Sequence, residues 1–290
     1  GGIGAALAAC RAGLRVAMTE DTDWIGGQLT SQGVPPDEHR WIETHGCTRS
    51  YRQLRDGIRE QYRRHYPLTE AARVHVHLNP GLGAVSRLCH EPRVALSVLE
   101  AMLQPHLSSG LLTLFLEHEP VEAWVDGDRV RAVAVQDLRT GRERVLEAAW
   151  FVDATELGDL LPLAGVEHVT GAESRSETGE LHAAEKADPA NQQAFTVCFA
   201  MDHAEGADAV MERPRDYGFW RDYVPRLKPP WPGRLLDLTY THPRTGEPRT
   251  PGFDPTRDDA GEGRFNLWVY RRIVAARLFV PGTYAGDVSL

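Results

Sequence analysis

The spacing of apolar positions divides the first hundred residues into helices and one short strand. Small and apolar residues over 3–12 predict a helix, and the apolar run 16–18 predicts a buried strand that ends in the acid Glu20. Apolar residues then recur every three or four positions over 49–66 and again from Pro92 onward, which predicts two more helices. Gly13 stands where the first helix would take its C-terminal cap.

Arginines are frequent in the predicted helix over 49–66, and most of them fall off its apolar stripe. A solvated face is the simpler interpretation, and an anion-binding face is the alternative. The pair His75 and His77 would share one face of a strand, but no third ligand of matching spacing stands near them. We therefore expect a polar strand face there and no metal.

The chain then becomes rich in strands. Asp126-Gly127 and Thr140-Gly141 are hairpin turn signals between short apolar runs. These runs predict a β-meander over about 111–149, with strands at 111–116, 121–125, 130–135 and 145–149. Farther on, Asp159 is the expected cap of a helix that opens after Gly158.

The character of the sequence changes after Gly165. Residues 172–190 are polar and acidic, as in a loop, and 195–201 has the pattern of a strand. We expect one domain over 1–165 and a second, mixed α+β domain over 166–290 that faces the substrate. Its aromatic residues would line a pocket for a sugar or an aromatic substrate, with core packing as the alternative: Trp220, Tyr223, Trp231, Tyr240, Trp268 and Tyr270.

Composition narrows the class of protein. The apolar content of 42% and the charged content of 25% are typical of globular proteins. With 32 basic and 41 acidic residues the formal charge is −9, which disfavours nucleic acid as a partner. No run approaches the roughly 20 apolar residues of a membrane span. The four cysteines are widely spaced, which favours free thiols and a cytoplasmic location, with secretion left open.

The N-terminal glycines carry the clearest chemical signal. Gly1 and Gly2 precede the first predicted helix, where a glycine turn lets backbone N–H groups approach a pyrophosphate. Glu20 follows at the strand end, about 20 residues on, where a carboxylate accepts ribose hydroxyls. Gly26 and Gly27 come next and let the chain pass close to a second part of a long cofactor. This pattern predicts a dinucleotide-binding α/β fold.

In the G-x-G-x-x-G/A motif Gly2 takes the second glycine position and Ala5 the third. The first glycine and the strand before it would then precede residue 1. We therefore expect the chain to begin inside a nucleotide-binding domain.

A resemblance rests on these residues and on three later segments. The spacing from Glu20 to Gly26-Gly27-Gln28, with FVDATELGD at 151–159, resembles FAD-dependent oxidoreductases of the glutathione-reductase-type fold. More narrowly, GGQLT at 26–30, VPPDEH at 34–39 and CHEP at 89–92 are similar to a bacterial family of FAD-dependent oxidoreductases over most of the chain.

The resemblance implies a Rossmann-like FAD-binding domain with a parallel sheet and a β-meander, and a segment after residue 290 that closes over the flavin. Glu156 departs from the classical second motif, which has glycine at that position. Val121 would offer backbone groups to the adenine. The full set of residues implied to bind FAD is Gly1, Gly2, Glu20, Gly26, Gly27, Gln28, Val121, Ala154 and Thr155.

Two histidines are candidates for catalysis. His39 lies with His45 in a polar loop after the Gly-Gly turn, and in the resembled proteins such a loop passes over the isoalloxazine ring. His90 and Cys89 stand just before a helix start, where the dipole lowers a thiol pKa. Imidazoles exchange protons near neutral pH, so we predict His39 and His90 as proton-transfer residues. A surface position for His39 and simple packing for His90 are the alternatives.

The leading hypothesis for function is an FAD-dependent oxidoreductase that transfers a hydride from a small organic substrate to flavin. A flavin monooxygenase or a nicotinamide-coupled reductase is the alternative among enzymes, although the residues show no second glycine-rich nucleotide motif. A nucleotide-binding module without turnover is the alternative from another class. Reduction of bound flavin by a substrate would separate an enzyme from such a module.

Overall fold

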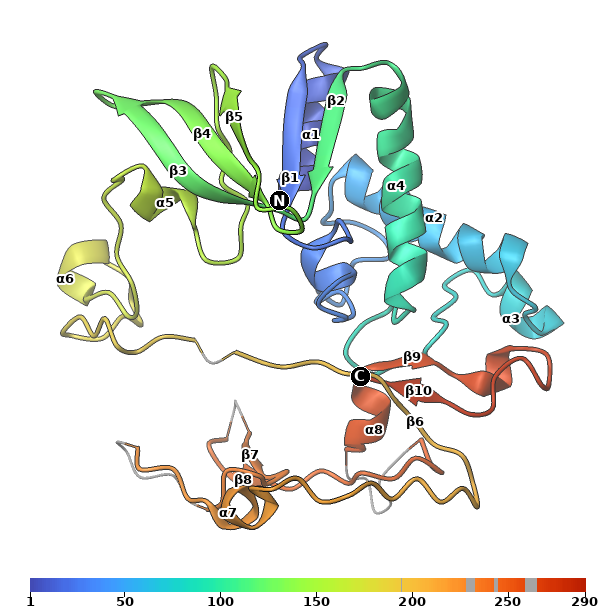
Figure 1. Cartoon of the computed structure of the whole chain (residues 1–290). Coiled ribbons are helices and arrows are strands. Elements are labelled where there is room, and N and C mark those ends of the chain that lie inside the picture. Colours follow the sequence, from blue (N-terminus) through green and yellow to red (C-terminus); the bar gives the residue numbers. More distant parts are fainter. Residues whose placement is uncertain (194, 228–232, 243–244, 259–264) are drawn as a thin grey trace. The chain divides into compact units, whose positions relative to one another are not determined.

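The structure is a computed structural model that describes residues 1–193, 195–227, 233–242, 245–258 and 265–290 (Figure 1). It forms two compact units, each built from three stretches of the chain. Unit 1 comprises Gly1–Val34, Cys47–Gln61 and Pro92–Phe199, and unit 2 comprises Pro35–Gly46, Tyr62–Glu91 and Ala200–Leu290. The domain boundary expected at residue 165 falls inside the last stretch of unit 1, and it stays a prediction.

Unit 1 contains a parallel pair of strands flanked by helices. Strand β1 (Val16–Glu20) pairs in parallel with β2 (Leu112–Leu116), so that Glu20 lies opposite Leu116. Helix α1 (Gly2–Arg11) contacts β1, and α4 (Pro92–Ser108) contacts β2 and α1 (Figure 1). Parallel strands need a long crossover connection, which here includes α4. Within the described residues the parallel sheet has these two strands.

The end of α1 confirms the predicted cap. Gly13 adopts a φ of +81°, and the N–H of Leu14 donates to the carbonyl of Ala9 at 3.0 Å. A left-handed glycine with this long hydrogen bond back into the last turn ends a helix sharply. The chain can therefore reverse at once into β1.

The β-meander is confirmed, with one correction. Strands β3 (His118–Asp126), β4 (Arg129–Asp137) and β5 (Glu143–Glu147) pair antiparallel in that order. The predicted strand 111–116 exists as β2, but it belongs to the parallel pair with β1 and not to the meander. Its pattern alone was compatible with either sheet, because a short apolar run does not reveal its partner.

Helix α2 (Arg49–His65) contradicts the interpretation of its arginines as a solvated face for two of them. Arg55 and Arg59, one turn apart, are only 1% and 3% exposed. Gly57 lies between them, and a Cβ there would come within 2.7 Å of Val98 Cγ1 on α4. Because two helices approach closely only where side chains are small, Gly57 sets the spacing of α2 and α4.

The predicted strand at 195–201 is wrong over most of its length. Only Met201–Asp202 forms a strand, β6, while Phe195, Val197 and Phe199 are exposed. Unit 1 also contains the short helices η1 (Gly27–Leu29), α5 (Leu160–Leu163) and α6 (Arg175–Thr178).

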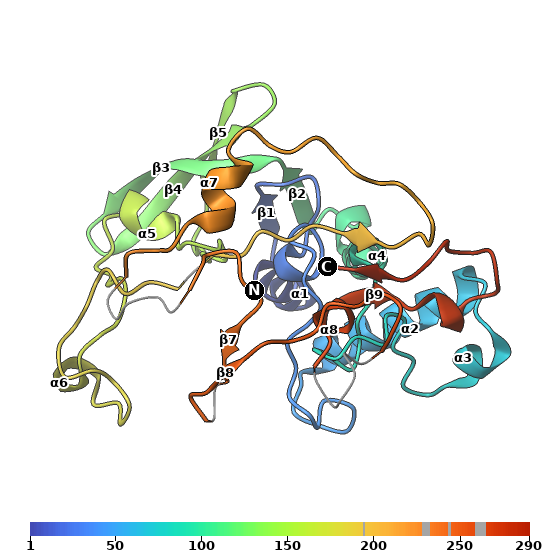
Figure 2. The ribbon, with the colours of Figure 1, turned by 90° about the horizontal axis from the view of Figure 1, so that it is seen from below.

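Unit 2 combines short helices with small antiparallel sheets, in keeping with a mixed α+β character. Strand β10 (Val288–Ser289) pairs with both β6 and β9 (Arg272–Val274), and α8 (Leu267–Tyr270) contacts β10 (Figure 1, Figure 2). The remaining elements are α3 (Glu70–Val74), α7 (Tyr217–Asp222), the hairpin β7 (Tyr240–Thr241) and β8 (Pro248–Arg249), and η2 (Ala276–Leu278). The strand expected around His75 and His77 is a turn after α3.

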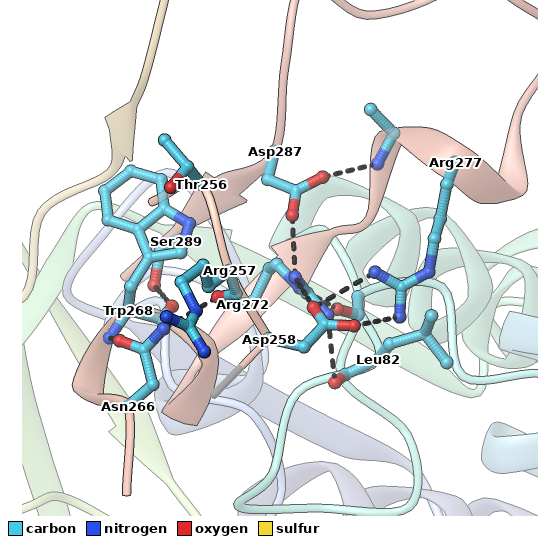
Figure 3. A network of polar contacts seen from close by, with 12 residues as sticks. Leu82, Thr256, Arg257, Asp258, Asn266, Trp268, Arg272, Arg277, Asp287 and Ser289 are labelled. Atoms are coloured by element: carbon cyan, nitrogen blue, oxygen red, sulfur yellow. Dashed lines mark hydrogen bonds and ion pairs between the residues drawn. The ribbon is translucent and has the colours of Figure 1, made fainter. Parts of the chain in front are cut away.

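A buried arginine organises unit 2. Arg272 is 2% exposed, and its guanidinium donates to Asp287 at 2.6 Å and to Asp258 at 2.8 Å (Figure 3). It also donates to the carbonyl of Gly81 at 2.7 Å. Arg277 also donates to Asp258, and these bonds hold the pKa of that carboxyl below its usual range. A buried cation is tolerated only when it is paired in this way. The network therefore ties β9 to the loop around Gly81.

Candidate functional site

The N-terminus of α1 lies beside the second predicted cofactor segment, within unit 1. A Cβ on Gly1 would be 3.4 Å from the Cβ of Ala154, and a Cβ on Gly2 would be 3.5 Å from it. The first backbone N–H groups of a helix have no partner inside the helix, and they form its positive end. The glycines at the start of the chain and Ala154, more than 150 residues later, thus lie together at the N-terminal end of α1, which is suited to bind an anion.

The turn after Ala154 is shaped by Asp153. Its carboxylate accepts the N–H and the hydroxyl of Thr155 at 3.0 and 2.8 Å, and the N–H of Leu160 at 3.0 Å. Asp159 occupies the cap position of α5, as expected, but its side chain makes no capping bond. The first N–H of the helix, that of Leu160, is bound by Asp153 instead. The bonds to Asp153 hold the Ala154–Thr155 turn in one geometry.

Gly26 and Gly27 are glycines for different reasons. Gly26 has a φ of +119°, and a Cβ there would lie 2.6 Å from Thr30 Oγ1 and 2.8 Å from Leu99 Cδ1. Thr30 is buried, and its hydroxyl donates to the carbonyl of Ile25 at 2.7 Å. The tight packing of this turn accounts for Gly26, whereas the Cβ position of Gly27 points toward Glu156.

Glu156 reaches from the second cofactor segment to the Gly-Gly turn. Its Oε1 accepts a hydrogen bond of 2.7 Å from Nε2 of Gln32, and a Cβ on Gly27 would be 3.2 Å from the same oxygen. The turn from Ala154 to Glu156 therefore touches both glycine segments, at the start of α1 and at η1. Glu156 is the residue that departs from the classical motif, but its bond to Gln32 could not be predicted, because nothing local in the sequence links the two.

Glu20 lies half-buried at the end of β1. Its Oε1 accepts the N–H of Thr22 at 3.1 Å and the hydroxyl of Thr22 at 2.8 Å. Burial, followed by a side-chain hydrogen bond with Asp21, raises the pKa of Glu20 above its usual value. Hydroxyl donors from a ligand would favour the charged form of this carboxylate.

Val121 lies at a bulge in β3. The register with β4 shifts between Pro120 and Glu122, which leaves Val121 as the extra residue. A bulged residue has backbone groups outside the regular ladder, so they are available to a ligand. Gln28 is exposed within η1.

His39 closes its own loop in unit 2. Its Nδ1 accepts the N–H of Trp41 at 3.2 Å, so its Nε2 carries the proton and donates to the carbonyl of Gly46 at 3.2 Å. Gly46 has a φ of +85°, and a Cβ there would lie 2.5 Å from Nε2 of His39. The glycine thus permits the close approach of the ring. Arg40 lies over the exposed Trp41 ring at 4.3 Å, and His45 is stacked beside it.

His90 is buried just before α4. Its Nδ1 donates to the carbonyl of Glu91 at 3.0 Å, because a carbonyl can only accept. The neighbouring Cys89 contradicts the expected activation: burial raises the pKa of its thiol to about 12. The two histidine loops meet within unit 2, where Ser86 donates to Glu38 at 3.2 Å.

A tyrosine–glutamate cluster next to His90 was missed by the sequence analysis. The hydroxyls of Tyr62 and Tyr284 both donate to Glu91 Oε2 at 3.0 Å, and Tyr62 also accepts the N–H of Glu91 at 2.9 Å. Tyr62 is fully buried, which together with the charge of Glu91 raises its pKa well above the usual value. The pattern at 49–66 marked Tyr62 only as an apolar position, because the periodicity does not show where its hydroxyl points.

The aromatic residues expected to face a substrate are divided between core and surface. Trp268 is buried and contacts Phe253 edge-on, so packing accounts for it. Trp220 is exposed in α7, with Tyr223 against its ring, and Tyr240 is exposed in β7. Trp231 lies outside the described residues.

In the described parts of the chain, no cluster of three or more His, Cys, Asp or Glu side chains is arranged to bind a metal ion. Among the helices of those same parts, none has the length and apolar character that crossing a membrane requires.

In this chain α1 begins with glycines that lie beside a second segment at Ala154, and β1, which follows α1, ends in an acid. This combination defines the class of dinucleotide-binding α/β proteins. Comparison with protein families gives a match over residues 1–289 to the family described as FAD dependent oxidoreductase. The chain belongs to this family: it is an FAD-dependent oxidoreductase, and its cofactor is FAD. A search of curated proteins finds no match.

The residues at the start of α1 fit this cofactor. Gly2 has no positive φ, and a Cβ there would make only ordinary contact with Ala154. The fold itself therefore does not require glycine at this position. A diphosphate that approaches the helix amides does require it, because a side chain would stand in its way.

Proposed function

We propose that this enzyme oxidises a small organic substrate by transfer of a hydride to FAD, and that FAD binds in an extended form along unit 1. The observation that carries the assignment is that Ala154 lies beside Gly1 and Gly2, and that the fold does not require glycine at Gly2. Bound FAD supplies the two-electron redox chemistry, while the protein binds, orients and shields it.

The unit 1 residues have separate roles in this proposal. The amides that open α1 hold the diphosphate, Glu20 accepts the ribose hydroxyls, and the bulge at Val121 offers backbone groups to the adenine. The other half of the cofactor runs past Gly26, Gly27, Gln28 and the Thr155 turn. Support comes from the contacts of the 154–156 turn with both glycine segments.

His39 and His90 are proposed to hold or move the proton that accompanies oxidation. Each ring has its orientation set by a backbone group, so the atom that carries the proton is defined: Nε2 in His39 and Nδ1 in His90. Fixed orientation is what a general acid or base requires. We propose a sugar or an aromatic compound as substrate, in view of the exposed rings of Trp220 and Tyr240.

Glycine-to-alanine substitutions in α1 test the cofactor assignment. Gly2→Ala fits sterically in the fold, because a Cβ there would make only ordinary contact with Ala154, so the apoprotein should be about as stable as the parent. Its methyl group would nevertheless obstruct the diphosphate, and the affinity for FAD should fall at least tenfold. Gly4→Ala is the matched control, since the motif accepts any residue there and a Cβ would meet nothing within 4 Å.

The measurements are the flavin dissociation constant by fluorescence quenching and the anaerobic bleaching of bound flavin by candidate alcohols, sugars and aromatic substrates. If Gly2→Ala and Gly4→Ala weaken FAD binding equally, or if Gly2→Ala does not weaken it, the assignment of the diphosphate to Gly2 is refuted. Bleaching by NADH or NADPH alone would indicate a nicotinamide-coupled reductase instead of a substrate dehydrogenase.

A further inference from the structure

Glu156 and Gln32 join two segments that are 124 residues apart in the sequence. One segment contains Ala154 and Thr155, and the other contains the Gly26–Gly27 turn. The donor is the side-chain amide of Gln32, the acceptor is Oε1 of Glu156, and their distance of 2.7 Å is that of a strong hydrogen bond to a carboxylate. The bond therefore links the two segments directly through their side chains.

The bond does little for the stability of the fold. Both side chains are exposed, and polar pairs in water contribute little to folding because water competes for each partner. The tight turn at Gly26 and the bonds to Asp153 already hold each segment internally. The bond instead determines where one segment lies relative to the other, and both segments carry residues assigned to the cofactor.

The charge of Glu156 also distinguishes the two ends of the 154–156 turn. Ala154 lies at the positive N-terminus of α1, whereas the Glu156 carboxylate lies within 3.2 Å of the Cβ position of Gly27. A diphosphate is attracted by the first end and repelled by the second. The hydroxyl-bearing, uncharged linker of a dinucleotide is compatible with the second end, because hydroxyls donate to carboxylates.

We propose that the Glu156–Gln32 hydrogen bond is a clasp that pre-forms the FAD site, with both residues acting as positioning residues for the cofactor. The inference rests on the assignment of FAD to unit 1 made above. A site whose two halves are already held together loses less conformational entropy when the ligand binds. Opening the clasp therefore weakens FAD binding without unfolding the apoprotein.

Exchanging the two side chains tests the clasp. Gln32→Glu places two carboxylates face to face and should raise the dissociation constant for FAD about two- to fivefold, the size of effect that an exposed pair can have. Glu156→Gln keeps an oxygen acceptor for Gln32 and should weaken binding less. The double variant Gln32→Glu/Glu156→Gln restores a carboxylate–amide pair with donor and acceptor reversed, and it should recover most of the parent affinity.

Fluorescence titration with FAD and the visible circular dichroism of the bound flavin are measured for the parent and the three variants, beside the melting temperature of each apoprotein. Recovery in the double variant at unchanged apoprotein melting temperatures supports the clasp. Parent-like affinity in Gln32→Glu, or no recovery in the double variant, overturns it while the flavin site stands. A parent protein that binds no FAD overturns the site assignment and the clasp together.

Discussion

Replacing Glu20 by glutamine should affect cofactor binding and apoprotein stability in opposite directions. The carboxylate is half-buried, and both its burial and the neighbouring Asp21 raise its pKa. A raised folded-state pKa means that the folded protein binds this proton more tightly than the unfolded chain does. The stability that the protonated side chain contributes is present at acidic pH and is lost as the pH rises through the raised pKa of Glu20. At pH 7 the ionised side chain therefore destabilises the apoprotein.

Glutamine removes the charge but retains an oxygen that can accept from Thr22. The loss in binding free energy for FAD is therefore the difference between a charge-assisted hydrogen bond of about 1.5–3 kcal/mol and a neutral one of about 0.5–1.5 kcal/mol. That difference of about 1 kcal/mol corresponds to a roughly fivefold weaker affinity. The apoprotein of Glu20→Gln should melt higher than the parent at pH 7, and this gain should disappear on acidification.

Calorimetric titration with FAD and thermal unfolding of the apoproteins between pH 4 and pH 8 measure both effects. Asp21→Asn is the matched control: it removes the neighbouring carboxylate and leaves Glu20 in place, so it should stabilise the apoprotein without weakening FAD binding. An unchanged FAD affinity in Glu20→Gln would show that Glu20 does not hold the ribose. A lower melting temperature at pH 7 would show that the carboxylate stabilises the fold, contrary to its raised pKa.

Two further predictions concern unit 2. Gly81→Ala should lower the free energy of unfolding, measured by urea titration, by more than about 2 kcal/mol, because its Cβ would overlap the carbonyl oxygen of Arg272. Gly218→Ala in α7 is the control and should be nearly neutral, because its Cβ would meet nothing within 4 Å. Tyr62→Phe should lower the free energy of unfolding by about 1–3 kcal/mol, since it leaves the part-buried N–H of Glu91 without its acceptor. The raised pKa of Tyr62 also means that the parent loses stability above about pH 10, because the tyrosine then ionises in the unfolded chain but not in the folded one. A Tyr62→Phe protein that loses stability over the same alkaline pH range would contradict this.

The sequence by itself determined the local elements of the site. The glycine start and capped end of α1, the acid at the end of β1, the hairpins of the meander and the Pro92 start of α4 all follow from residues close together in the chain. Turns, caps and periodic apolar stripes depend on short-range sterics and hydrogen bonds, so they can be predicted from neighbours alone. The family resemblance rested on the same local segments.

The tertiary structure decided what depends on distant partners. Strand 112–116 joined the parallel pair, Arg55 and Arg59 of an amphipathic helix became buried, and the thiol of Cys89 acquired a raised pKa where a helix start suggested a lowered one.

The same limit applies to the candidate site. That Asp153 and not Asp159 holds the α5 turn, and that Glu156 meets Gln32, follows only from where the folded backbone places these side chains. Burial, strand pairing and the solvation of a charge are set by atoms that come from elsewhere in the chain, and a linear pattern carries no information on which of them will arrive.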